Sequence, residues 1–422
     1  MRAIVTGGAG FIGSNLVDEL VDRGDEVTVV DDLSTGRAEN LDGAIERGAK
    51  LVVLDIRDVD DLDGAFAAAR PQVVFHFAAQ IDVRKSVADP GWDAQINVGG
   101  TINVLRAALA HGVDRVVNSS TGGAIYGDAR TIPSTERTTA LPEAPYGQSK
   151  LAAEGYIGLF ERLHSLNAVT LRYGNVYGPR QDPLGEAGVI AIFCGKLEDG
   201  GTPTVYGDGR QTRDFVYVGD VVAANLAAAT ARAHGPVNIG TAVETSVLDI
   251  VEVLRELGGR EDFQPQFAPA RDGEIARSCL NISRARSAHH PVDLHAFGRQ
   301  QLGQVGAVLA GDPRDQRARR VRAHRRPAAA CVASSVLRSP SRIETSGDQR
   351  STRRARAMLR QLRASSPSRA GANWGVKSSR PPSSASSSTM SRTLVSTAVP
   401  MLTGPWARAA AAARFAATTS PT

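Results

Sequence analysis

The sequence predicts an α/β protein built on a doubly wound parallel sheet. Apolar segments at residues 2–5, 27–30, 51–54, 73–77 and 113–118 have the length and composition of buried strands, and helical patterns separate them. Strands that alternate with helices favour a parallel sheet, whose ligands bind beyond the carboxyl ends of the strands. Glycines, carboxylates and hydroxyls follow these segments, so we expect a ligand site along that edge.

A glycine-rich turn follows the first predicted strand. It contains Gly7, Gly10 and Gly13, with Phe11 and Ile12 opening a helix. The first glycine permits a tight turn, the second lets backbone N–H groups approach a pyrophosphate, and the third allows helix and sheet to pack closely. The strand, turn and helix together predict a Rossmann fold that binds a dinucleotide through these five residues.

Carboxylates follow the next two predicted strands. Asp31 would accept hydrogen bonds from the adenosine ribose hydroxyls and would repel a 2′-phosphate, which favours NAD over NADP. The alternative is that Asp31 and Asp32 form a solvated pair that opens the following turn. Asp55 and Ile56 occupy the corresponding position after the third strand, and we assign them to the same cofactor.

Tyr146 and Lys150 supply a candidate acid–base pair. They are four residues apart on a helix that begins at Pro145, so they would lie on the same face. The ammonium would stabilise the phenolate, and the pKa of Tyr146 is expected to fall from about 10 towards neutrality. Such a phenol can take a proton from a secondary alcohol while hydride leaves the carbon. The spacing alone also fits an exposed helix face without a function.

A hydroxyl at the end of the strand at 113–118 would complete a Ser/Thr–Tyr–Lys set. Ser119, Ser120 and Thr121 all stand there, ahead of the Tyr146 helix. In such a set the hydroxyl hydrogen-bonds the reacting oxygen, the phenol moves the proton, and NAD carries the hydride.

These motifs resemble those of the extended short-chain dehydrogenases/reductases of the NAD-dependent epimerase/dehydratase family, most of all the UDP-glucose (UDP-galactose) 4-epimerases. The resemblance covers roughly residues 1–287 and includes the segments at 171–180 and 212–217. It implies that Thr121 is the catalytic hydroxyl, with Ser120 as the second choice, because the loop between these hydroxyls and Tyr126 is one glycine longer than the common pattern. The resemblance implies further cofactor contacts from Phe77, Ala78, Ala79, Asn97, Ser119, Tyr146, Lys150 and Tyr173.

The same resemblance implies a UDP-sugar site after residue 171. The expected contacts are the reacting sugar oxygen for Thr121, the diphosphate for Asn175, Arg213 and Arg271, the uridine for Val189 and Tyr206, and the C2 substituent of the sugar for Ser278. Arginine suits phosphate because its planar fork bonds two oxygens at once, although a surface ion pair, such as Arg213 with Asp214, is the alternative. Because Ser278 is small, we expect some tolerance of N-acetyl sugars.

The reaction class is indicated by Gly122 and Gly123. Related 4,6-dehydratases carry Asp-Glu at these two positions, and decarboxylating relatives carry a Glu in this loop, whereas this loop has no ionisable group there. One acid–base and one hydride carrier suffice to oxidise C4 and to return hydride to the other face, so we expect an NAD-dependent UDP-hexose 4-epimerase. The alternatives are an epimerase or reductase of another nucleotide sugar and a non-catalytic NAD-binding protein.

Charge divides the 422-residue chain into two unlike parts. Residues 289–422 hold 22 Arg and Lys against 5 Asp and Glu, a net charge of +17, and the whole chain is +5, so residues 1–288 carry −12. We therefore predict an NAD-binding Rossmann domain at 1–171, an interleaved nucleotide-sugar part at 172–287, and a low-complexity, disordered tail at 288–422. A DNA frame shift, a natural extension, or a basic arm for nucleic acid would each explain this tail, and the last is disfavoured because it lacks interleaved aromatics.

Cysteine usage and the start of the chain favour a cytoplasmic protein. Cys194, Cys279 and Cys331 are scattered, without the spacing of a disulfide framework or a metal site. The chain opens on a strand, without a basic and apolar leader or an apolar run of about 18 residues. We expect no metal and no membrane contact, and the resemblance implies a homodimer formed through two helices.

Overall fold

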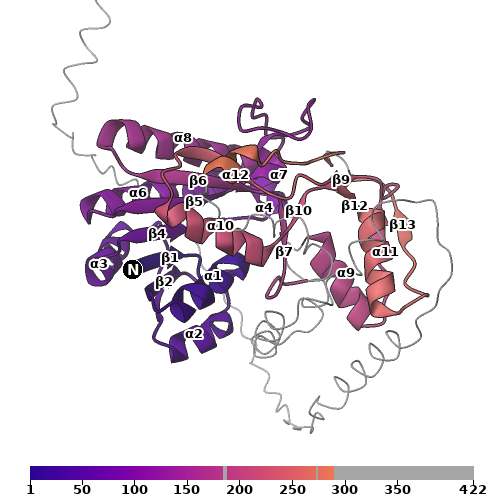
Figure 1. Ribbon diagram of the computed structural model, residues 1–422, viewed down its shortest axis with the longest axis horizontal. Coiled ribbons are helices and arrows are strands. Elements are labelled where there is room, and N and C mark those ends of the chain that lie inside the picture. Colours follow the sequence, from indigo (N-terminus) through magenta and orange to yellow (C-terminus); the bar gives the residue numbers. More distant parts are fainter. Residues whose placement is uncertain (184–187, 272–273, 289–422) are drawn as a thin grey trace, which may run out of the picture. The chain divides into compact units, whose positions relative to one another are not determined.

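The fold is organised on a seven-stranded sheet in which every neighbouring pair is parallel (Figure 1). The computed structural model describes residues 1–183, 188–271 and 274–288. The strand order is β11 (Gly235–Ile239), β6 (Ala168–Tyr173), β5 (Arg115–Thr121), β4 (Val73–His76), β1 (Arg2–Thr6), β2 (Glu26–Asp31) and β3 (Lys50–Val53). The predicted fold class is confirmed, and the order reverses between β1 and β4, where such sheets bind ligands. The prediction for the tail beyond residue 288 lies outside the described residues.

Helices cover both faces of this sheet (Figure 1). One face carries α1 (Phe11–Asp22), α2 (Asp42–Glu46) and α10 (Val218–Thr230), and the other carries α3 (Val59–Ala69), α6 (Thr101–Ala110) and α8 (Pro145–His164). Side chains alternate between two cores, since Val5 belongs to the cluster with α1 and α10 and its neighbour Ile4 to the cluster with α3, α6 and α8. This is why the strands are almost continuously apolar.

Two boundaries differ from the sequence prediction. Strand β5 continues to Thr121, so the hydroxyl residues lie within the strand instead of after it. The helical pattern between the predicted strands at 73–77 and 113–118 covers residues 95–110, and in the structure this helix begins as the π-helix η2 (Gln95–Gly100) before α6, preceded by α4 (Val83–Ala88) and α5 (Pro90–Ala94). Wider π turns often accompany functional sites, and here the turn carries Asn97.

Smaller pairs of strands and five further helices form the rest of the regular structure in the described chain. The strand pairs are β7 (Asn175–Tyr177) with β10 (Phe215–Tyr217), β9 (Thr212–Arg213) with β12 (Thr245–Ser246), and β8 (Thr204–Tyr206) with β13 (Gln266–Ala268). The remaining helices are η1 (Ala38–Leu41), α7 (Gly122–Ile125), α9 (Val189–Glu198), α11 (Val247–Gly258) and α12 (Ser283–Ala288). Of these, α9 packs on α11.

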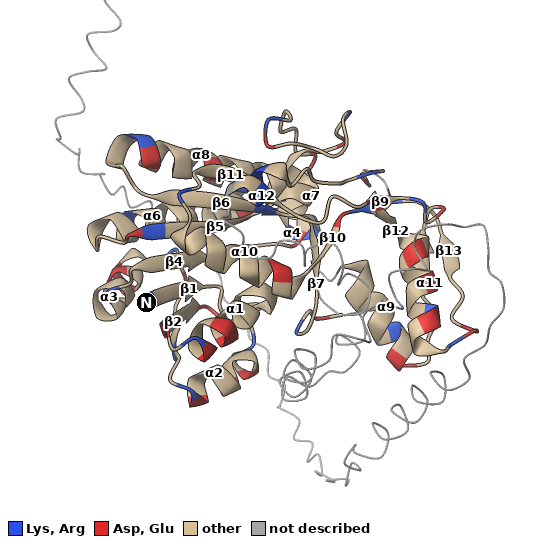
Figure 2. Ribbon diagram, in the orientation of Figure 1, with Lys and Arg blue, Asp and Glu red and all other residues tan. Residues whose placement is uncertain are grey.

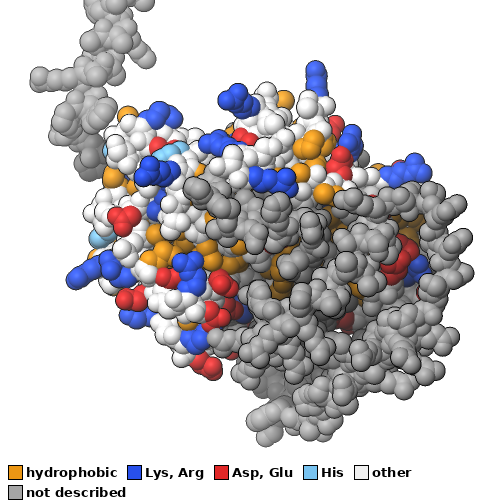
Figure 3. All heavy atoms as spheres, in the orientation of Figure 1, with side chains coloured by type: hydrophobic (Ala, Val, Ile, Leu, Met, Phe, Trp, Pro, Cys, Tyr) orange, Lys and Arg blue, Asp and Glu red, His pale blue; other side chains and the backbone are white. Residues whose placement is uncertain are grey.

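Charged residues lie mainly on the outer helices, such as α2 and α11, and most of the sheet lacks them (Figure 2). On the face shown in Figure 3, acidic and basic side chains are interspersed among the described residues. No helix in the described ranges combines the length and apolar character needed to cross a membrane. Within those ranges, His, Cys, Asp and Glu side chains do not gather in threes as a metal site requires.

Candidate active site

Helix α8 presents Tyr146 and Lys150 at the carboxyl edge of the sheet. Pro145 occupies its first position, and the Tyr146 N–H, one of the donors left over at a helix start, donates to Ser86 Oγ at 3.1 Å. Tyr146 is half-buried and Lys150 is buried. The i, i+4 spacing therefore points both side chains into the protein. This excludes the alternative that the spacing belongs to an exposed helix face.

The expected lowering of the pKa of Tyr146 is wrong for the protein as described. Burial raises the pKa of Tyr146 to about 12, the charge of Asp93 raises it further, and a hydrogen bond with Thr121 lowers it. Burial also lowers the pKa of Lys150 to about 8, against the charges of Glu154 and Asp93. For both side chains, the effect of burial on the pKa outweighs the effects of the neighbouring groups. The spacing in the sequence alone could not reveal this.

Thr121 and Ser120 point in different directions because successive residues of a strand alternate. Thr121 Oγ1 accepts from the Ala124 N–H at 3.2 Å and caps α7, which leaves its own hydrogen for the Tyr146 phenol. Ser120 Oγ instead donates to Glu154 Oε1 at 2.6 Å. The geometry thus joins Thr121, and not Ser120, to the acid–base pair.

A buried ionic network lies beneath these groups. Arg172 Nη2 donates to Glu154 Oε2 at 2.6 Å, and both side chains are less than one-tenth exposed. Arg172 Nη1 also donates to the Tyr126 hydroxyl at 2.9 Å, and that hydroxyl donates to Asn238 Oδ1 at 2.7 Å. Strands β5, β6 and β11 and helix α8 are therefore locked together around the candidate site.

The glycine-rich turn leaves no room for side chains. A Cβ on Gly7, whose φ is +67°, would lie 2.5 Å from the Ala78 nitrogen, and one on Gly13 would lie 2.3 Å from the Gly7 carbonyl oxygen. Gly10 caps α1 without a side-chain bond, so the N–H groups of Phe11 and Ile12 lack intrahelical acceptors. This cradle of free donors at a helix N-terminus fits a pyrophosphate.

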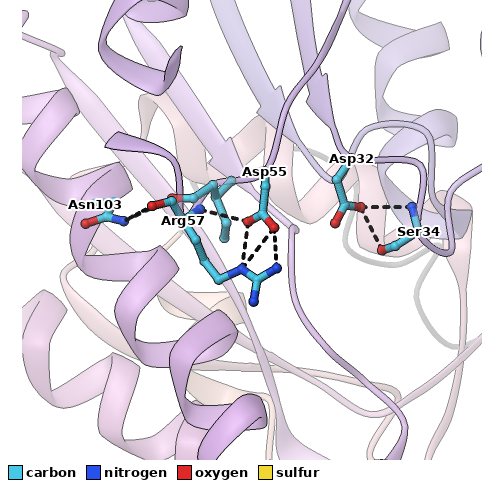
Figure 4. Close-up of polar contacts among 6 residues, drawn as sticks. Asp32, Ser34, Asp55, Arg57 and Asn103 are labelled. Atoms are coloured by element: carbon cyan, nitrogen blue, oxygen red, sulfur yellow. Dashed lines mark hydrogen bonds and ion pairs between the residues drawn. The ribbon is translucent and has the colours of Figure 1, made fainter. Parts of the chain in front are cut away.

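Asp31 and Asp55 lie at the ends of β2 and β3, as expected. Asp31 accepts from the Ala9 and Leu33 N–H groups, both at 2.9 Å, and burial raises its pKa against these bonds. Asp55 forms an ion pair with Arg57, whose Nε lies 2.9 Å from Asp55 Oδ2 (Figure 4). This hydrogen bond lowers the pKa of Asp55. Asp32, also shown in Figure 4, accepts from the Ser34 N–H and hydroxyl instead.

A hydrogen-bonded chain orders the loop after β4. The Thr101 hydroxyl donates to the Asn97 carbonyl at 2.6 Å, so it must accept from His76 Nε2 at 2.9 Å. Nδ1 of His76 then accepts from Thr6 Oγ1, which receives the Ala78 N–H. Burial lowers the pKa of His76 to about 3, so this histidine is a packing residue that holds Ala78 in place.

Asn97 joins the same loop to α8. Its amide donates to the Gln80 carbonyl at 2.9 Å and to Ser149 Oγ at 3.1 Å, and its oxygen accepts from the Gln80 N–H. The other expected cofactor residues lie along this edge as follows: Ile56 buried after β3, Phe77 and Ala79 half-buried after β4, Ser119 buried in β5, and Tyr173 buried in β6. The Tyr173 hydroxyl donates to Asn225 Oδ1 at 3.0 Å, so only its ring is free to face a cofactor.

The expected sugar-nucleotide residues lie on the small strand pairs. The Arg271 guanidinium stacks 3.9 Å from the centre of the Tyr206 ring, next to the pairing of β8 with β13. Arg213 lies 3.5 Å from Glu274, so its ion-pair partner is Glu274 and not Asp214, which was considered as the alternative to a diphosphate role. Asp214 is buried and instead accepts from Thr241, Ala242 and Leu280.

Asn175 lies in the small strand pair of β7 with β10, next to the loop that follows Thr121. Its Oδ1 is buried without a donor among the described residues and lies 3.4 Å from the position of a Cβ on Gly123. An orphaned amide oxygen beside the reactive loop fits a polar ligand. Val189 begins α9 half-buried, and Ser278, also half-buried, donates its N–H to the Thr212 carbonyl.

Several residues of the site were missed in the sequence. Glu154 lies four residues beyond Lys150, and Asp93 four residues before Asn97, so helical spacing could have indicated both. Arg172 and Tyr126 carried no such signal, since their partners are distant in the chain.

The parallel sheet, the glycine turn and the Tyr146 helix define a dinucleotide-binding α/β protein. The family model described as the NAD dependent epimerase/dehydratase family matches residues 3–240, more than half of the chain. The chain belongs to this family.

Named relatives match the same part of the chain. A UDP-glucose 4-epimerase of Mycolicibacterium smegmatis is 46% identical over 294 residues, which cover 68% of this chain and 91% of that protein. The Thermotoga maritima UDP-glucose 4-epimerase, solved with UDP-glucose, is 41% identical with a TM-score of 0.68, over 73% of this chain and 98% of that one. The Thermus thermophilus enzyme of the same name, solved with NAD, is 38% identical with a TM-score of 0.65, over 73% and 99%.

Proposed function

We propose that the protein is an NAD-dependent 4-epimerase that interconverts UDP-glucose and UDP-galactose. The observation that carries the proposal is the convergence of Thr121, Tyr146 and Lys150 at the carboxyl edge of the sheet, beside Gly122 and Gly123. A Cβ on Gly122 would lie 2.6 Å from the Leu280 side chain, so the extra acid of a dehydratase would not fit there without movement. The relatives named above are epimerases of this substrate class.

The residues present fit NAD. Gly7, Gly10 and Gly13 leave a cradle for the pyrophosphate, and Asp31 retains lone pairs for ribose hydroxyls. When bound, NAD accepts a hydride from a carbon atom and returns it. Bound NAD would also supply a positive charge, and a positive charge in this site would favour the Tyr146 phenolate and lower its pKa towards the working range.

Tyr146 would take the proton from the C4 hydroxyl and return it to the C4 oxygen after the 4-keto sugar has turned and C4 presents its opposite face for the returning hydride. Thr121 would orient the reacting oxygen by hydrogen bonding, and Lys150 would stabilise the phenolate. Asn175, Arg213 and Arg271 would hold the diphosphate while the hexose rotates, with Tyr206 and Val189 beside the uridine. The division at residue 171 between a cofactor part and an interleaved substrate part remains part of this proposal.

Incubation of the purified protein with UDP-galactose and no added cofactor tests the proposal. We expect UDP-glucose to accumulate to an equilibrium mixture, with NAD carried through purification. A protein that leaves UDP-galactose unchanged but consumes added NADH with another nucleotide sugar would instead be a reductase. A protein that binds NAD but leaves every UDP-hexose unchanged would be non-catalytic.

Ser278 motivates a test of substrate range. A small side chain leaves room for an N-acetyl group on C2, so UDP-N-acetylglucosamine should be turned over within about tenfold of UDP-glucose. A bulky variant, Ser278→Tyr, should lose the N-acetyl substrate selectively. Equal effects on both substrates would show that Ser278 does not determine the selectivity for the C2 substituent.

A homodimer in the cytoplasm completes the proposal. Val83 and Val87 on α4 and Tyr156 and Leu163 on α8 are exposed, and these two helices are in contact. Apolar side chains gathered on neighbouring helices favour a protein interface. Sedimentation analysis should give twice the monomer mass, and Val87→Asp should reduce it to the monomer.

A further inference from the structure

Asp93, in helix α5, is a buried acid that the mechanism above does not use. Its side chain is 0% exposed, and Oδ1 accepts from Gln80 Nε2 at 2.8 Å and from Asn97 Nδ2 at 3.1 Å. Oδ2 is also buried and has no donor within the described part of the chain. A buried carboxylate with an unpaired oxygen carries a large desolvation penalty, so a positive charge should lie nearby.

Lys150 is the candidate for that charge, because the Asn97 amide donates to Asp93 Oδ1 and to Ser149 Oγ, both at 3.1 Å, and Ser149 directly precedes Lys150 in α8. Helix α5 packs against α8, which carries Lys150 and Tyr146. Among the influences on Lys150, burial lowers its pKa most, Glu154 raises it, and Asp93 raises it next. Asp93 also raises the pKa of Tyr146, so its charge reaches both groups of the acid–base pair.

The two acids around Lys150 differ in their own partners. Glu154 is already paired with Arg172, through a bond of 2.6 Å, and with Ser120. Asp93 is bonded only to neutral amides. Within the described residues Asp93 therefore lacks a directly bonded cation, so its charge is the one left for Lys150 to balance, although Glu154 has the larger influence on the pKa of Lys150.

No other charged group takes this position in the described structure around α5 and α8. His76 on β4 stays neutral, since burial and the charge of Lys150 lower its pKa to about 3. Arg84 and Lys85 on α4 are exposed to solvent. Helix η2 contributes no charged side chain.

We propose that Asp93 is the buried counter-ion of Lys150, a positioning residue that keeps the ammonium charged and, through Asn97, holds α8 against the loop after β4. The inference rests on the proposed function only in so far as that function gives Lys150 catalytic work. Charge pairing itself can be measured without cofactor or sugar.

Lysine titration tests the pairing directly. The chain has five lysines, so a ¹³C-lysine NMR spectrum is simple, and Lys150→Met identifies the signal of Lys150. In Asp93→Asn the titration of Lys150 should move to lower pH by about one unit, as expected for loss of one nearby charge. Asp89→Asn is the control, because it removes an equal charge from the exposed start of the same helix and asparagine caps as well as aspartate. A folded Asp93→Asn protein with an unmoved Lys150 titration would overturn the proposal.

A double-mutant cycle on stability gives a second measurement. Each of Asp93→Asn and Lys150→Met leaves one charge unpaired, whereas the double variant leaves none. The unfolding constant of the double variant should be about tenfold smaller than independent effects predict. Failure of Asp93→Asn alone to fold, with recovery in the double variant, also supports the pairing, while additive effects or failure of both contradict it. Coupling found in a protein without epimerase activity would reject the proposed function and keep this inference.

Discussion

The main sheet and the small strand pairs hold their expected ligands in different ways. At the main sheet the clearances are fixed by backbone, as where a Gly13 Cβ would come within 2.3 Å of a carbonyl, and the charges beneath are buried in pairs such as Glu154 with Arg172. Strands β8, β9, β12 and β13 have only two or three residues each. The Tyr206 ring there is 37% exposed.

This difference fits the division of labour in an epimerase. A cofactor that is reoxidised in place needs a rigid cradle, since a small displacement changes hydride transfer strongly. A sugar that must present both faces needs anchoring at its diphosphate and freedom at its ring. Substitutions at the main sheet should therefore reduce kcat or cofactor retention, and those at the small pairs should raise KM.

The largest effect is expected at the acid–base. Tyr146→Phe should lower kcat by about 10³-fold, because it removes the group that moves the proton. NAD content after purification should be unchanged. Tyr156→Phe, on the exposed side of the same helix, is the control and should retain activity. Undiminished interconversion in Tyr146→Phe would refute the assignment.

Gly13→Ala should be next in size. The new methyl group would overlap the Gly7 carbonyl, so about 1–3 kcal/mol of stability should be lost together with bound NAD. Gly64→Ala in α3 is the matched control, since its Cβ would meet nothing within 4 Å and helical alanine is favoured. Thermal unfolding and the absorbance of bound cofactor measure both effects, and equal behaviour of the two variants would contradict the cradle.

Arg271→Ala sharpens the comparison on the substrate side. Loss of a guanidinium that bonds phosphate should raise KM for UDP-galactose about tenfold or more and leave kcat within a few fold. Arg210→Ala, an exposed arginine on the loop before β9, should change neither constant. A fall in kcat with unchanged KM would place Arg271 at the chemistry instead of at the diphosphate.

The smallest effect is expected at the rim of the cofactor site. Asp55 and Arg57 are about one-third or more exposed, so Arg57→Ala should lower stability by at most about 1 kcal/mol. Because pairing lowers the pKa of Asp55 below 3.8, this contribution is complete above that pH and disappears as the pH falls through the lower value of the folded state. Urea unfolding should therefore separate the two proteins by more at pH 7 than at pH 3.

Local spacing was sufficient to predict the fold class, and it indicated that the glycine turn opens a helix, that Asp31 ends a strand and that Tyr146 and Lys150 share a helix, while the roles of these residues stay predictions. Each depends on residues within one strand, turn or helix, where period and residue type determine direction. The alternative partner considered for Arg213 was its neighbour Asp214, but Arg213 lies near Glu274 and Asp214 accepts from Thr241, and both of these partners are distant in the chain.

Tertiary structure alone decided which groups surround the acid–base. Ser120 turns to Glu154, 34 residues away, and Tyr126 to Asn238, 112 residues away, so no local pattern could report these contacts. The direction of the pKa of Tyr146 likewise depends on how much water the assembled helices and strands exclude. Burial is a property of the packed chain, and for that reason the sequence indicated candidate residues for the acid–base group while the fold determined their electrostatics.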